Sequence, residues 1–262
     1  MKEKDQNVQN IESRYKPIEV LARLQSLQHA QRINGVGFDV FDTLLKSLYT
    51  DTQMVEILSV IISDYLMERG ASVPRDVIFN EYLELRKKLR NDSSKLRSDI
   101  PIKEQETLER VVVESFGLNY NVGNNKRFFD FVQERWMDYD LHNITPVPGM
   151  TRVVSESIKL FGRKHVGIYT NHSYDRAHVL SILSSSGIVG PQMIDPKNVF
   201  SSINSGLVEY SVCLRKPNPL AFTLLSNKLD VLPNELAFVG DGKNDYLFAE
   251  RSAGVGIRFG MA

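Results

Sequence analysis

Acidic residues follow two of the apolar runs that we predict to be buried strands. Asp39 follows residues 36–38, and Asp241 and Asp245 follow residues 236–239. Carboxylates gathered in one crevice repel one another and raise at least one pKa. A divalent cation removes that repulsion, and Mg²⁺ prefers hard oxygen ligands together with water and phosphate. These strand ends therefore favour a magnesium site that takes a phosphorylated ligand.

A hydroxyl and a lysine follow two further segments. Thr170 and Asn171 follow the apolar run 165–169, and Lys216 lies just before a predicted helix at 218–229. A carboxylate beside Mg²⁺, with a hydroxyl and a lysine in reach, is suited to attack phosphorus and form an acyl phosphate. The metal and the lysine would offset charge on the phosphoryl oxygens. Each aspartate taken alone is more typical of a helix cap or a turn, so the prediction depends on their combination.

The segments around these side chains alternate between strand and helix patterns. Strands are predicted at 36–38, 165–169, near 199, at 236–239 and at 255–258, and helices at 149–161, 174–186, 218–229 and 245–252. This alternation predicts an α/β fold with a parallel sheet covered by helices on both faces. In such sheets, ligands bind beyond the carboxyl ends of the strands.

Residues 50–141 carry a different pattern. Apolar positions recur at helical spacing, without a strand pattern, near 52–69, 75–90, 102–116 and 125–139. An all-helical block inside a mixed chain predicts an inserted domain. We therefore expect an N-terminal helical extension at 1–33 with an amphipathic helix at 11–33, an α/β core at 34–45 and 145–262, a helical insert at 46–144, and a return linker at 143–149.

Composition narrows the class of protein. The 262 residues include 32 Lys and Arg and 32 Asp and Glu, and a net charge of zero argues against a nucleic-acid partner. The single cysteine, Cys213, excludes an internal disulfide and indicates a reducing compartment. Residues 1–10 are polar, and the most apolar stretch, 54–67, is too short to cross a bilayer. We expect a cytoplasmic protein without a membrane partner, and the sequence leaves its oligomeric state open.

Four segments, in this order, resemble the motifs of the haloacid dehalogenase (HAD) superfamily. They are residues 38–44 (FDVFDTL), 168–171 (IYTN), 216–219 (KPNP) and 239–245 (VGDGKND). Their order and spacing fit, so the resemblance covers roughly residues 34–262. The helical block at 46–144 resembles the cap that many members carry after the first motif. The resemblance implies a Rossmann-like core and a hydrolase that uses Mg²⁺ and acts on a small phosphorylated metabolite.

The resemblance also implies a role for each motif residue. Asp39 would be the nucleophile and a metal ligand, with the backbone carbonyl of Phe41 and the carboxylate of Asp241 as further ligands. Asp245 would ligate the metal through water or hold Lys216 in place. Three groups would contact the phosphoryl oxygens: Thr170, the Asn171 backbone amide and Lys216.

One position departs from the phosphatase pattern. Phosphatases of this superfamily usually carry a second aspartate where this chain has Phe41, and Asp42 lies one residue further. General acid catalysis is worth roughly 10²–10⁴ in rate, and its loss matters most for alkoxide leaving groups. Related dehalogenases have an aromatic residue here, which keeps open a 2-haloacid dehalogenase that uses Asp39 without metal. A catalytically weak relative that binds a phosphorylated ligand or a protein also stays open. Asp241 and Asp245 favour phosphoryl chemistry, because without a cation they would raise the pKa of Asp39.

Overall fold

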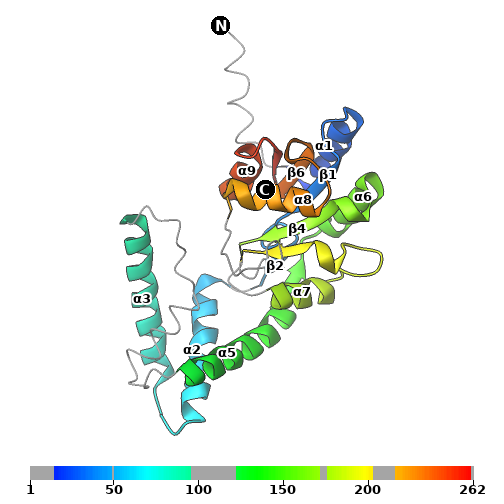
Figure 1. Ribbon diagram of the computed structural model, residues 1–262. Coiled ribbons are helices and arrows are strands. Elements are labelled where there is room, and N and C mark those ends of the chain that lie inside the picture. The colour runs from blue at the N-terminus through cyan, green and yellow to red at the C-terminus, as the bar shows by residue number, and fades with distance from the viewer. Residues whose placement is uncertain (1–14, 49, 96–121, 172–175, 203–215, 261–262) are drawn as a thin grey trace. The chain divides into compact units, whose positions relative to one another are not determined.

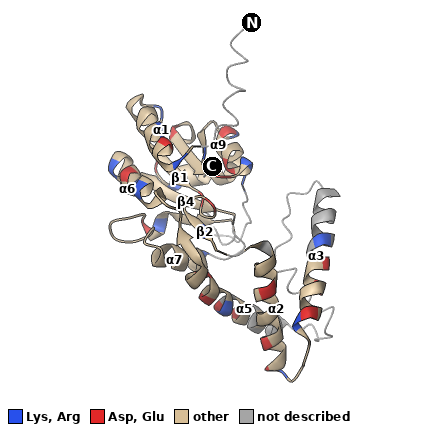
Figure 2. Cartoon of the chain, turned by 180° about the vertical axis from the view of Figure 1, so that it is seen from behind, with Lys and Arg blue, Asp and Glu red and all other residues tan. Residues whose placement is uncertain are grey.

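The computed structural model describes residues 15–48, 50–95, 122–171, 176–202 and 216–260 (Figure 1). The chain divides into two compact units, one formed by residues 1–47 and 144–262 and the other by residues 48–143. In Figure 2, each unit carries residues of both signs of charge, although α2 carries only acidic ones. Among the described residues, no helix has the length and apolar character needed to cross a membrane.

The first unit is built on a five-stranded parallel sheet with the order β5-β4-β1-β6-β7. Its strands are β1 (Gly35–Phe38), β4 (Val166–Thr170), β5 (Val199–Ser201), β6 (Leu236–Gly240) and β7 (Val255–Arg258). Every residue of the first four is buried, which is typical of strands covered by helices on both faces. All five carboxyl ends lie at one edge, so the predicted α/β architecture is confirmed.

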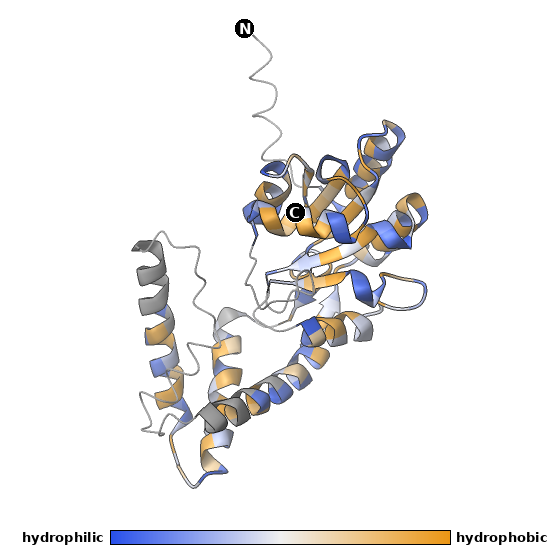
Figure 3. Cartoon of the chain, in the orientation of Figure 1, coloured by the Kyte–Doolittle hydropathy of each residue, from blue (hydrophilic) through white to orange (hydrophobic). Residues whose placement is uncertain are grey.

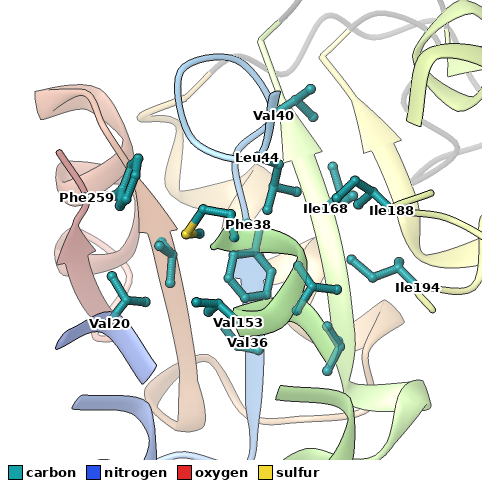
Figure 4. Close-up of a cluster of buried hydrophobic side chains, with 14 of the residues drawn as sticks. Val20, Val36, Phe38, Val40, Leu44, Val153, Ile168, Ile188, Ile194 and Phe259 are labelled. Carbon is teal, nitrogen blue, oxygen red and sulfur yellow. The ribbon is translucent and has the colours of Figure 1, made fainter. Parts of the chain in front are cut away.

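Two apolar clusters cover the two faces of this sheet. The first contains Phe38 and Val239 together with the buried sides of α1 (Pro17–His29), α6 (Met150–Phe161) and α7 (Arg176–Ser185) (Figure 4). The second contains Phe238, the neighbour of Val239 in the strand, with α8 (Pro219–Lys228) and α9 (Lys243–Glu250). Successive strand residues point to opposite faces, so the two clusters lie on opposite sides. Figure 3 shows that these helices carry both hydrophobic and hydrophilic residues.

A tight turn and a small sheet follow β1. The backbone amides of Leu44 and Leu45 both donate to the carbonyl of Val40, at 2.8 and 2.9 Å. Asp42 in this turn has a φ of 56°, a left-handed conformation that aspartate tolerates better than most residues. β2 (Leu45–Ser47) then pairs antiparallel with β3 (Ile144–Pro146). Of these two strands, β3 lies in the stretch 143–149 that we expected to be a linker.

The second unit, in its described part, consists of α2 (Asp51–Met67), α3 (Arg75–Lys95) and α5 (Val122–Asn143). Thr50 caps α2, because its Oγ1 accepts from the amide of Gln53 at 3.3 Å while its own amide donates to Gln53 Oε1 at 2.8 Å. Tyr65 on α2 meets Phe128 on α5 with ring centroids 4.7 Å apart. The predicted helix at 102–116 lies outside the described residues. That this unit acts as a cap stays a prediction.

Candidate active site

Asp39 lies at the carboxyl end of the central strand. It directly follows β1, and its amide donates to the carbonyl of Val239 at 2.9 Å, which continues the pairing with β6. Phe38 points into the first apolar cluster, so the side chain of the next residue points to the opposite face. Asp39 is only 7% exposed, and a carboxylate this deeply buried needs a partner.

That partner is Lys216, which precedes α8. Its Nζ lies 2.5 Å from Asp39 Oδ1 and also donates to Asp245 Oδ1. Asn171 holds the lysine backbone at both ends of the residue, since its Oδ1 accepts from the Lys216 amide at 2.8 Å and its Nδ2 donates to the Lys216 carbonyl at 3.2 Å. The ammonium is therefore anchored through both its main chain and its side chain.

Asp241 and Asp245 come from the loop after β6 and the first turn of α9. Asp245 Oδ2 accepts from the amide of Gly242 at 2.9 Å, as the acidic residue of a capping box does. A Cβ placed on Gly240 would lie 2.3 Å from Asp245 Cβ, so the close approach of this carboxylate to the strand end requires glycine there. Asp241 contacts Thr43, whose Oγ1 accepts from its amide at 3.1 Å.

The three carboxylates form a donor set that fits Mg²⁺. Oxygens of Asp39, Asp241 and Asp245 all lie within 4.8 Å of one another. Hard oxygen ligands are what Mg²⁺ takes, and a divalent cation would offset the negative charge that the single ammonium of Lys216 leaves uncompensated.

Burial and mutual repulsion shift the protonation of this cluster. Burial raises the pKa of Asp39 to about 7; the Lys216 ammonium opposes that rise, and the carboxylates of Asp245 and Asp241 add to it. Burial, followed by the charges of Asp245 and Asp42, also raises the pKa of Asp241. Burial works against the charge of Lys216, yet the two ion pairs raise its pKa. A cation held by these carboxylates would favour their ionised form and so lower both carboxyl pKa values.

The remaining predicted residues lie at the same edge or in the turn beside it. Thr170 ends β4, next to β1, and is buried, with its carbonyl accepting from the amide of Ser202 at 2.9 Å. Phe41 bridges to Leu45 in the turn and packs on the first apolar cluster. Asp42 is exposed.

Two contacts were missed by the sequence analysis. The Thr43 hydroxyl contacts Asp241, and the side chain of Asn171, rather than its backbone alone, takes part in the site. Both residues are polar and lie inside motifs that the sequence analysis recognised, and this position was the one feature of the sequence that could have indicated a role in the site.

Comparison with known proteins places the chain among hydrolases. A family model for haloacid dehalogenase-like hydrolases matches residues 33–252. No curated protein matches the chain.

Solved structures with detectable similarity include proteins of different activities. A predicted phosphoglycolate phosphatase from Haemophilus somnus 129PT is 18% identical, covering 86% of this chain and 84% of that chain with a TM-score of 0.49. A HAD family hydrolase from Deinococcus radiodurans R1, with bound phosphate and sodium, is 15% identical, covering 86% and 80% with a TM-score of 0.41. The defluorinating L-2-haloacid dehalogenase Rha0230 is 17% identical, covering 86% and 80% with a TM-score of 0.47.

Proposed function

The chain belongs to the haloacid dehalogenase-like hydrolases, and we propose that it is a Mg²⁺-dependent phosphohydrolase acting on a small phosphorylated metabolite. The observation that carries this proposal is the cluster of Asp39, Asp241 and Asp245, whose oxygens lie within 4.8 Å of one another. We also propose a cytoplasmic location, because a single cysteine among 262 residues is typical of a reducing compartment.

Asp39 is the proposed nucleophile. One of its carboxylate oxygens attacks phosphorus, the bond from phosphorus to the leaving group breaks, and an aspartyl phosphate forms. Water then attacks the same phosphorus, which releases inorganic phosphate and restores the carboxylate. Bound Mg²⁺, held by Asp39, Asp241, Asp245 and the carbonyl of Phe41, would offset charge on the phosphoryl group.

The other residues bind and orient the phosphoryl group. Lys216, whose Nζ is 2.5 Å from Asp39 Oδ1, is placed to neutralise a phosphoryl oxygen brought against that carboxylate. Thr170 ends β4 and Asn171 follows it, so the Thr170 hydroxyl and the Asn171 amide lie at the same edge of the sheet and would donate to the other phosphoryl oxygens. Asp245 keeps Lys216 in position through the second ion pair.

The turn after Asp39 determines which leaving groups we expect the enzyme to accept. Phe41 has no proton to transfer, and its side chain packs on the apolar cluster. A leaving group of low pKa, such as an acyl or aryl oxide, departs without a proton, whereas an alkoxide needs one. The proposed enzyme therefore prefers activated phosphates to sugar phosphates.

Phe41 also supports a second candidate, a 2-haloacid dehalogenase in which Asp39 attacks carbon and expels halide. That reaction needs no metal, so it gives Asp241 no role and leaves Asp245 only its contacts with Lys216 and the Gly242 amide. The two carboxylates would instead raise the pKa of the nucleophile, as burial does. We therefore rank phosphoryl chemistry first.

One panel of reactions separates these functions. Purified protein is assayed with acetyl phosphate, 4-nitrophenyl phosphate, glucose 6-phosphate and L-2-chloropropionate, each with Mg²⁺ and with EDTA, beside D39N as the inactive control. The phosphohydrolase releases phosphate only with Mg²⁺ and most rapidly from the first two compounds. Halide release in EDTA would establish the dehalogenase instead. Turnover of no compound by the wild type would favour a binding protein.

A further inference from the structure

Thr43 connects the turn after β1 to the loop after β6. It is fully buried, and its Oγ1 accepts a hydrogen bond from the Asp241 amide at 3.1 Å. The same hydroxyl lies 3.5 Å from Asp241 Oδ1, to which it donates. One hydroxyl thus contacts both the main chain and the side chain of a single residue 198 positions away.

In this arrangement the Thr43 hydroxyl acts both as a hydrogen-bond donor and as an acceptor. A threonine hydroxyl has one proton to donate and lone pairs to accept, so it can accept from the amide while donating to the carboxylate. The amide bond holds the backbone of Asp241, and the longer contact of 3.5 Å with Oδ1 restricts the rotation of its side chain. Because the carboxylate group is planar, restricting Oδ1 also restricts the position of Oδ2 of Asp241.

The need for such a constraint follows from the exposure of Asp241. Asp39 and Asp245 are buried and ion-paired with Lys216, so their carboxylates are already fixed. Asp241 is less buried. The negative charges of Asp245 and Asp42 act on Asp241, and their repulsion favours rotating its carboxylate away from the cluster.

We infer that Thr43 is a positioning residue that holds the Asp241 carboxylate in the orientation required to bind the divalent cation. This inference rests on the proposed function, since it assigns a role within the same metal site. It goes beyond the ligands themselves, because Thr43 would act through Asp241 without touching the metal. Groups that orient metal ligands by hydrogen bonds typically change metal affinity about 10–100-fold when removed.

The test measures cation binding without turnover. Mn²⁺ takes the same oxygen ligands as Mg²⁺, and its binding is followed by the loss of the EPR signal of the free ion. T43V replaces the hydroxyl with a methyl group of similar size, and T43S keeps the hydroxyl. T43C provides a second variant with only a weak donor, should T43V fold poorly. S157A removes a buried hydroxyl that bonds Val153 on α6, and serves as the matched control.

T43V and T43C should weaken Mn²⁺ binding about tenfold or more, while T43S and S157A bind as the wild type does. Wild-type affinity in folded T43V or T43C would overturn the inference. So would a loss in T43S equal to that in T43V, because the packing of the side chain rather than its hydroxyl would then matter. Failure of the wild type itself to bind Mn²⁺ would overturn the proposed function and this inference together, which distinguishes the two cases.

Discussion

The Nζ of Lys216 lies 2.5 Å from Oδ1 of Asp39, and the two residues are only 5% and 7% exposed. The same ammonium contacts Asp245. Charges removed from water are tolerated only when they are paired, because the cost of desolvation must be offset by their attraction. Both carboxylates therefore depend on the one ammonium, and removal of Lys216 leaves them as buried charges without compensation.

The first prediction concerns the loss of this ammonium. K216M should destabilise the protein by about 3–5 kcal/mol in EDTA, because Asp39 and Asp245 are left as buried carboxylates without a counter-ion. Mg²⁺ should recover part of that loss, since a cation compensates the same carboxylates. Chemical denaturation with and without Mg²⁺ measures both effects.

A surface lysine provides the control for this measurement. Lys164 pairs with Asp230, and both side chains are 67% exposed. K164M should change stability far less than K216M, because solvent already screens that pair. Equal losses in the two variants would contradict the assigned role of the buried ion pairs.

The second prediction is a dependence of stability on pH in the metal-free protein. The pKa of Asp39 is raised from 3.8 to about 7, chiefly by burial. The folded state therefore binds this proton more tightly than the unfolded state. The stability it contributes is fully present below about pH 4 and is lost as the pH rises to about 7. D39N lacks the titrating group.

In EDTA, the unfolding free energy of the wild type minus that of D39N should therefore fall between about pH 5 and about pH 7, by at most about 1.4 kcal/mol per pH unit. Above about pH 7.5 the difference should level off. Mg²⁺ should abolish the fall, because a bound cation favours the ionised carboxylate. A difference that stays constant across this range in EDTA would show that Asp39 titrates normally.

The third prediction concerns the leaving group. F41D supplies a carboxyl group two residues after the nucleophile and should raise hydrolysis of glucose 6-phosphate relative to 4-nitrophenyl phosphate, by up to about 10²-fold. F41L is the control, because it removes the aromatic ring without adding an acid. The ratio of the two rates is measured, since both variants lose packing against the apolar cluster and their absolute rates reflect that loss as well.

Asp42 supplies the opposing test. Its carboxylate is exposed and its backbone has a φ of 56°, so we expect it to take no part in proton transfer. D42N should leave the ratio of the two rates unchanged. If D42N selectively slows sugar phosphate hydrolysis, Asp42 provides the proton that Phe41 does not.

The core of this fold was predictable because its strands are mostly apolar and its motifs follow in order. Strands expected at 165–169 and 255–258 were found as Val166–Thr170 and Val255–Arg258. Parallel strands bring their carboxyl ends to one edge, so the approach of Asp39 and Asp241 followed from the class of sheet.

Contacts that depend on side-chain geometry were not predictable. The bond between Thr43 and Asp241 joins residues 198 positions apart, and no periodic pattern reports such a pair. β2 and β3 have three residues each, too few for an alternating pattern to be recognised. Residues 11–14 of the predicted helix at 11–33 lie outside the described residues. In the described part the helix spans Pro17–His29, and Gln31 beyond its end has a positive φ of 54°.

The last prediction concerns α1, which precedes the region that the family model matches. Its residues Val20, Leu21, Leu24 and Leu27 are buried in the first apolar cluster, whereas Ile18 on the same helix is 65% exposed. L24A should therefore cost about 2–5 kcal/mol, because it leaves a cavity in the first apolar cluster. I18A should cost less than about 0.5 kcal/mol, as surface substitutions do. Hydrogen exchange of β1 reports the stability of this unit alone, whatever the other unit does. Faster exchange of β1 in L24A than in I18A would show that α1 belongs to the folding core that supports Asp39. Equal rates would show that α1 does not stabilise this sheet.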